Sequence, residues 1–149
     1  HNKWMRYALI EAEKAFEENE VPVGAVVVKN GKIIGRGYNR VEALKDPTAH
    51  AEIIAITAAS AYTGSKWLVD CSVYVTLEPC PMCAGAMILA RVKNLIFGTS
   101  DPRAGACGSV VDIVNDNRFN HRINTTKGIL DEECGSLLKE FFKKLREKA

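Results

Sequence analysis

The stretches His50–Glu52 (HAE) and Pro79–Cys83 (PCPMC) indicate a metal site, and with it the kind of fold that builds one. A single His and two Cys provide three protein ligands for zinc. A catalytic zinc site keeps its fourth position open for water, whereas a structural site fills it with a protein ligand. Glu52 is not needed as a ligand, so it is the candidate catalytic acid–base for that water. We therefore expect one catalytic Zn²⁺ per chain, bound by His50, Cys80 and Cys83.

The spacing of both motifs places them at the starts of helices. Cys80 and Cys83 are three residues apart, so their sulfurs face the same way on a first helical turn. Pro81 suits that turn because first-turn N–H groups have no intrahelical partner. Upstream of the His motif, Asp46 or Thr48 is expected to cap the other helix. Two helix N-termini should thus meet at one zinc, where the helix dipole favours the metal-binding thiolate.

Other interpretations of the cysteines use only part of the pattern. A Cys-x-x-Cys pair can be a redox dithiol, but that motif needs no His-x-Glu partner. A structural zinc would need a fourth ligand, and none of the candidates forms a second closely spaced pair. These candidates are Cys71, Cys107, Cys134 and His121. The catalytic interpretation is favoured because it accounts for both half-motifs.

Composition is that of an ordinary globular chain. With 149 residues, 47% hydrophobic and 26% charged, we expect a single domain over residues 1–149. The net charge of +2 is too small to indicate nucleic-acid binding by itself. No apolar run is long enough to span a bilayer, so no membrane association is expected, and no signal-peptide pattern is present. Five cysteines, an odd number, then favour a reducing, cytoplasmic location.

Hydrophobic periodicity predicts alternating helices and strands. Asn30-Gly31 between two β-rich runs is a strong hairpin signal. Residues 110–114 are ambiguous and could form a short helix. The expected helices cover residues 5–16, 47–62, 82–90 and 137–145, and the expected strands cover 24–29, 32–38, 71–77, 94–98 and 122–127. This order predicts an α/β fold with three layers, α/β/α, in which helices flank a mixed five-stranded sheet.

Over nearly its whole length the chain resembles the bacterial tRNA-specific adenosine deaminases, within the cytidine-deaminase-like superfamily. His-x-Glu with Pro-Cys-x-x-Cys is a signature of zinc nucleobase deaminases in general. The finer likeness lies in residues 20–25 (EVPVGA), 46–52 (DPTAHAE), 74–80 (YVTLEPC) and 120–122 (NHR). The resemblance implies a cytidine-deaminase-like fold and conversion of the wobble adenosine in a tRNA anticodon stem-loop to inosine. It also implies a cytoplasmic homodimer.

One residue departs from this pattern. Pro81 stands where the tRNA enzymes usually carry Val or Ile, and Pro-Cys-Pro-Met-Cys is typical of guanine deaminases. Those enzymes resemble the chain less well at residues 21–23, 76–77 and 120–122. A free-purine (guanine) deaminase therefore remains the alternative. A zinc-stabilised binding module without catalysis is a third hypothesis, and Glu52 argues against it because such a module has no use for that carboxylate.

The resemblance also implies roles for individual residues. Glu52 would move protons from the zinc-activated water to ring N1 and to the leaving amine, which requires a raised pKa. The Asn39 amide would pair with the N7 edge of adenine, although a turn-forming role fits it equally well. Phe142 could instead be core, and Arg146 one charge of a solvated face. The implied substrate-binding residues are Asn39, Ala51, Asp101, Arg103, Asn120, Phe142 and Arg146.

Overall fold

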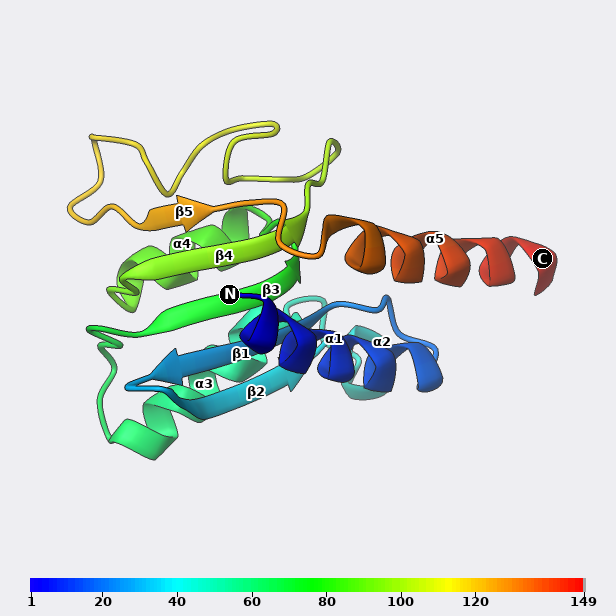
Figure 1. The fold of residues 1–149 in the computed structure, drawn as a ribbon, viewed down its shortest axis with the longest axis horizontal. Helices are drawn as coiled ribbons and strands as arrows, with labels where there is room; N and C mark the ends of the chain where they lie inside the picture. The colour runs from blue at the N-terminus through cyan, green and yellow to red at the C-terminus, as the bar shows by residue number, and fades with distance from the viewer. Residues whose placement is uncertain (149) are drawn as a thin grey trace.

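A mixed sheet forms the centre of the computed structural model, which describes residues 1–148. The strand order is β2-β1-β3-β4-β5, with β1 antiparallel to both of its neighbours and β3, β4 and β5 mutually parallel (Figure 1). The strands are β1 (Gly24–Lys29), β2 (Lys32–Tyr38), β3 (Ser72–Leu77), β4 (Asn94–Thr99) and β5 (Asn124–Thr126). This confirms the predicted mixed sheet of five strands and the Asn30-Gly31 hairpin.

Helices cover both faces of the sheet. They are α1 (Asn2–Glu17), α2 (Val41–Leu44), α3 (Ala51–Thr63), α4 (Pro81–Leu89) and α5 (Asp131–Lys148). Successive strand residues point to opposite faces, and β1 shows the consequence. Ala25 and Val27 pack in one cluster with α3 and α4, whereas Val26 and Val28 pack in the other with α1 and α5. The three-layer α/β/α arrangement is therefore confirmed.

Two glycines bring α3 close to the sheet. A Cβ atom added to Gly37 would lie 2.4 Å from the carbonyl oxygen of Ala51, and one added to Gly35 would lie 2.4 Å from that of Ala55. Both values are far below a van der Waals contact, so the backbone of β2 and that of α3 approach as closely as glycine permits. This packing fixes the first turn of α3 against the sheet edge.

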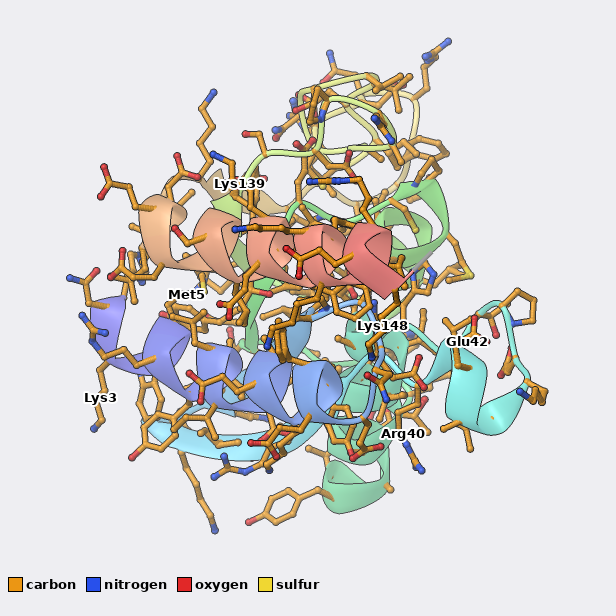
Figure 2. All side chains as sticks on the ribbon, turned by 90° about the vertical axis from the view of Figure 1, so that its right-hand side faces the viewer. Lys3, Met5, Arg40, Glu42, Lys139 and Lys148 are labelled. Atoms are coloured by element: carbon orange, nitrogen blue, oxygen red, sulfur yellow. The ribbon has the colours of Figure 1, made fainter. Side chains whose placement is uncertain are left out.

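The two helices of the other face run side by side in the same direction (Figure 2). Arg6 pairs with Glu133 at 3.8 Å near their starts, and the rings of Phe16 and Phe141 meet edge-on with centroids 6.0 Å apart. The end of α5 with Lys148 lies at the same end of the molecule as α2 (Figure 2). The last turns of α5 thereby come close to the end of the sheet where β2, β3 and β4 have their carboxyl ends.

One predicted helix start is wrong. Residues 47–50 are not helical, and α3 begins at Ala51. Asp46 does not cap this helix, because its Oδ1 accepts hydrogen bonds from the N–H and the hydroxyl of Thr48, at 2.8 and 2.7 Å, and closes a local turn. Instead His50 occupies the N-cap position.

Two further segments differ from the prediction or were not foreseen. Residues 110–114 form no helix, since Val110 and Ile113 donate backbone hydrogen bonds to Gly105 and Ala106 of the preceding loop. The short helix α2 was not predicted, because four residues give too little periodicity.

No helix within residues 1–148 has both the length and the apolar composition needed to cross a membrane.

Candidate metal centre and active site

Two helix N-termini meet at the sheet edge and carry the predicted ligands. His50 is the N-cap residue of α3, and Cys80 is the N-cap residue of α4 with Pro81 at the first helical position. Cys83 lies in the first turn of α4 and is fully buried. The expected meeting of two helix starts is therefore observed.

The geometry of this cluster fits a tetrahedral zinc. Nδ1 of His50 lies 3.6 Å from Sγ of Cys80 and 3.5 Å from Sγ of Cys83. All three ligand atoms lie within 4.8 Å of one another. Zn–S bonds of about 2.3 Å and Zn–N bonds of about 2.0–2.1 Å at tetrahedral angles separate sulfur from nitrogen by about 3.6 Å. The residues present are thus spaced as the metal requires.

The protonation of the two thiols is unequal. A hydrogen bond from Cys83, aided by His50, lowers the pKa of Cys80 to about 4, against the opposing effect of burial. The same hydrogen bond to Cys80 and burial raise the pKa of Cys83. The hydrogen bond with Cys80 also raises the pKa of His50. One thiolate is therefore already favoured, and a bound cation would deprotonate the second thiol.

Glu52 lies beside this cluster without belonging to it. It occupies the first turn of α3 and is 4% exposed. Burial raises the pKa of Glu52 to about 7. A carboxyl group with a pKa near the working pH is suited to accept and return protons. A raised pKa is what a proton-transfer role of Glu52 requires.

A cavity of about 470 Å³ opens onto these groups. Its size lies in the range of small-molecule and cofactor sites. It brings together six of the predicted residues from five separate parts of the chain. The six are Asn39, His50, Glu52, Cys80, Asp101 and Phe142.

A second cavity of about 680 Å³ adjoins the first and shares Asp101 and Phe142 with it. Arg103 and Arg146 line this second cavity, so two guanidinium groups lie next to the candidate active site. Their position suits contacts with phosphates on either side of a bound base.

Two predicted substrate contacts are not brought to either cavity. Ala51 is fully buried at the start of α3, and its backbone N–H is already bonded. Asn120 is exposed in the long connection between β4 and β5, and it lines neither cavity.

The side chain of Asn39 has a fixed orientation. Its Oδ1 accepts a hydrogen bond of 2.8 Å from the N–H of Ala51. Because that partner is a donor, the amide must present its oxygen to Ala51 and its Nδ2 elsewhere. The Nδ2 donor of Asn39 is therefore left available for a ligand in the cavity.

Sequence reasoning missed several residues that line the cavity. Val21 and Leu77 form apolar parts of its wall, and Glu20 and Glu78 contribute carboxylates that are each only 2% exposed. The available signal was chemical: Glu78 directly follows an apolar strand and precedes Pro-Cys, a place where an unpaired carboxylate would be costly.

Fold and site together define a class of protein. Helix N-termini that present one His and two Cys beside a buried Glu, on an α/β/α sheet, are typical of the zinc nucleobase deaminases. In agreement, the family model of MafB19-like deaminases matches residues 1–146.

Comparison with individual proteins narrows the class. The chain is 46% identical over 145 residues to the tRNA-specific adenosine deaminase of Bacillus subtilis (strain 168), covering 97% of this chain and 90% of that protein. A solved structure from studies of A-to-I editing by tRNA:A34 deaminases at the wobble position matches with a TM-score of 0.89 and 40% identity, covering 93% of this chain and 100% of the other. The guanine deaminase of Nitrosomonas europaea is less similar, with a TM-score of 0.79 and 27% identity over 94% of this chain and 83% of the other. The chain belongs to the tRNA-specific adenosine deaminase family.

Proposed function

We propose that this protein hydrolytically deaminates adenosine to inosine at the wobble position of a tRNA anticodon, using one Zn²⁺ bound by His50, Cys80 and Cys83. The observation that supports this most strongly is the buried Glu52 beside a ligand cluster with zinc spacing, at the floor of one cavity. When bound, zinc would supply a water activated as a nucleophile at neutral pH. In the net reaction, water oxygen replaces the amino nitrogen at C6 and ammonia leaves.

Glu52 moves the protons of this reaction. Its carboxylate accepts a proton from the water nucleophile and delivers it to ring N1. It then passes the water's second proton to the amino group, which leaves as ammonia. A pKa of about 7 makes both directions of transfer accessible at neutral pH.

The cavity wall orients the base and its neighbours. Nδ2 of Asn39 donates to N7 of the purine, a contact open to adenine and guanine alike. Phe142 is 42% exposed at the cavity and presents an aromatic face on which a base can stack. Arg103 and Arg146 bind the flanking phosphates from the adjoining cavity.

The position of Pro81 removes the sequence argument for free guanine as the substrate. Pro81 is the residue that likens the motif to guanine deaminases, yet it is exposed at the start of α4 and lines neither cavity. The residue that departs from the family pattern is therefore not part of the substrate-binding wall.

We further expect a homodimer acting in the cytoplasm, and the exposed apolar side chains of Met82 and Leu89 on α4 support a contact between copies.

The decisive test compares substrates directly. The zinc-loaded protein is incubated with a deacylated tRNA pool, and inosine is measured at position 34 in the isolated tRNAs. Parallel reactions measure ammonia release from free guanine and free adenosine. We expect inosine in tRNA and no turnover of the free purines. Rapid guanine turnover without inosine in tRNA would establish the alternative.

A further inference from the structure

Glu78 holds a loop to the end of β3 through its carboxylate. Oε1 accepts hydrogen bonds from the backbone N–H of Asp101, at 3.0 Å, and from the hydroxyl of Ser109. Oε2 accepts from the backbone N–H of Cys107 and of Ser109, at 3.0 and 3.1 Å. One buried carboxylate thus gathers both ends of residues 101–109.

Among residues 1–148, the carboxylate of Glu78 is stabilised by hydrogen bonds from this loop. Glu78 is 2% exposed, and within residues 1–148 no Lys, Arg or His forms an ion pair with it. Gly105 allows the loop to enclose the carboxylate, because an added Cβ would lie 2.4 Å from both Cδ and Oε2 of Glu78. Burying this charge is costly unless the loop supplies its hydrogen bonds, and the loop in turn is held in place by the same bonds.

The same loop forms part of the wall of the candidate active site. Asp101 and Ala104 line the cavity that holds Glu52. Oδ1 of Asp101 accepts hydrogen bonds from the N–H groups of Arg103 and Ala104, at 3.0 and 3.2 Å, so its side chain closes the turn between them. The position of this wall therefore follows from where Glu78 holds the N–H of Asp101.

We propose that Glu78 is a positioning residue that prearranges the wall formed by Asp101 and Ala104 for the nucleotides around the reacting base. The inference rests on the proposed function, because it concerns binding at that site. Glu78 does not touch the reacting atoms, so its role is to reduce the ordering that the loop would otherwise undergo on binding. Loss of this prearrangement lowers the fraction of binding-competent protein and weakens apparent affinity in proportion.

Replacing Glu78 by Gln separates the hydrogen bonds of the two oxygens. The Gln oxygen is best placed at the Oε2 position, where it keeps the N–H groups of Cys107 and Ser109. The amide NH₂ group of Gln then takes the Oε1 position and can donate to the Ser109 hydroxyl. It cannot accept from the N–H of Asp101, because both groups are donors. Glu78→Gln should therefore lose one backbone hydrogen bond, that of Asp101.

The test measures both the loop and the substrate. Backbone amide hydrogen exchange is followed by NMR, and steady-state inosine formation is measured on a synthetic anticodon stem-loop with adenosine at position 34. In Glu78→Gln we expect exchange at Asp101 to accelerate about tenfold, with Cys107 and Ser109 still protected. KM should rise about tenfold, while kcat stays within about threefold and zinc content is unchanged.

Two variants control this experiment. Glu11→Gln removes another buried carboxylate, which is 3% exposed on α1, is bonded to Lys14 and lines neither cavity, and it should change neither KM nor exchange in the loop. Gly105→Ala displaces the loop while keeping Glu78 and should also raise KM at constant zinc content. It tests the proposal by a second route if Glu78→Gln is recovered unfolded.

Three outcomes would overturn the positioning role: unchanged exchange at Asp101, wild-type KM in Glu78→Gln and Gly105→Ala, or a fall in kcat in place of the rise in KM. A wild-type protein that forms no inosine on the stem-loop would instead overturn the proposed function, and the KM claim with it. In that case exchange at Asp101 still decides whether Glu78 holds the loop.

Discussion

Oδ1 of Asn39 accepts a hydrogen bond of 2.8 Å from the backbone N–H of Ala51, so the residue that follows β2 satisfies the first N–H of the helix that carries Glu52. First-turn N–H groups have no partner within their own helix. Here the partner comes from the cavity wall, and the helix start and the wall are fixed to each other. Asn39 thus has a structural function through Oδ1 and, we propose, a substrate-binding function through Nδ2.

Substitutions at Asn39 should separate these two functions. Asn39→Asp keeps an acceptor for Ala51 and places a negative charge at a helix N-terminus, where it is favourable, so unfolding free energy should stay near wild type. The purine N7 loses its donor, so KM should rise about tenfold for one lost hydrogen bond. Asn39→Ala should also lose the hydrogen bond to the N–H of Ala51, at about 1 kcal/mol of stability. Denaturant unfolding and steady-state kinetics measure the two effects. A wild-type KM in Asn39→Asp would show that Nδ2 of Asn39 does not contribute to substrate binding.

Metal content should depend on the cluster and not on cysteine in general. Elemental analysis should find one zinc per wild-type chain and a large loss of zinc in Cys83→Ala. The matched control is Cys71→Ala, which removes another fully buried thiol that lies outside the cluster and should retain the metal. Chelation should lower the melting temperature of the wild type, because a metal that binds the folded state stabilises it. Equal zinc in the two variants would contradict the ligand assignment.

The close contact between β2 and α3 can be tested with a pair of glycines. In Gly37→Ala the new methyl group collides with the carbonyl of Ala51, so we expect a loss of about 1–3 kcal/mol of unfolding free energy. Gly85 lies inside α4, where an added Cβ would have open space beyond the helix's own backbone, so Gly85→Ala should stabilise by about 1 kcal/mol through helix propensity. Denaturant unfolding of both variants checks the opposite signs. A destabilisation of the same size in both would mean that the contact is not specific.

Charge on α5 should contribute to binding only where it faces the adjoining cavity. Arg146→Ala should raise KM for a tRNA substrate and reduce the salt dependence of binding by about one counterion. Lys143→Ala removes a charge from the same helix at a position that lines none of the described cavities, and it should have a smaller effect. Binding measured across a range of salt concentrations gives, for each variant, the slope of log K against log salt concentration. Equal slopes in Arg146→Ala and Lys143→Ala would show that the position of a charge on α5 does not matter for binding.

Much of the architecture could be predicted because local and global signals agree. The runs that became β1 and β2 are rich in β-branched residues and flank an Asn-Gly turn, whose residues both have positive φ values, 52° for Asn30 and 71° for Gly31. The clustering of His50, Cys80 and Cys83 could be predicted because zinc chemistry restricts residue type and spacing more strongly than packing does.

The remaining features depend on contacts that spacing alone does not encode. The predicted start of α3 is wrong because Asp46 bonds to Thr48 nearby, while the first N–H of the helix, that of Ala51, bonds to Asn39 twelve residues earlier. The role of Glu78 depends on a loop that begins twenty-three residues later at Asp101. Such tertiary partners become visible only once the sheet has brought the segments together.

The most direct test of the account is the rate of inosine formation in Glu52→Gln, measured beside the wild type on an anticodon stem-loop with adenosine at position 34, with zinc quantified in the same samples. The substitution keeps the size of the side chain and removes the group that moves protons. We expect one zinc per chain in both proteins and a rate lower by at least about 10²–10⁴-fold in the variant. A variant that keeps its zinc and forms inosine at nearly the wild-type rate would contradict the assignment of Glu52 as the proton-transfer group.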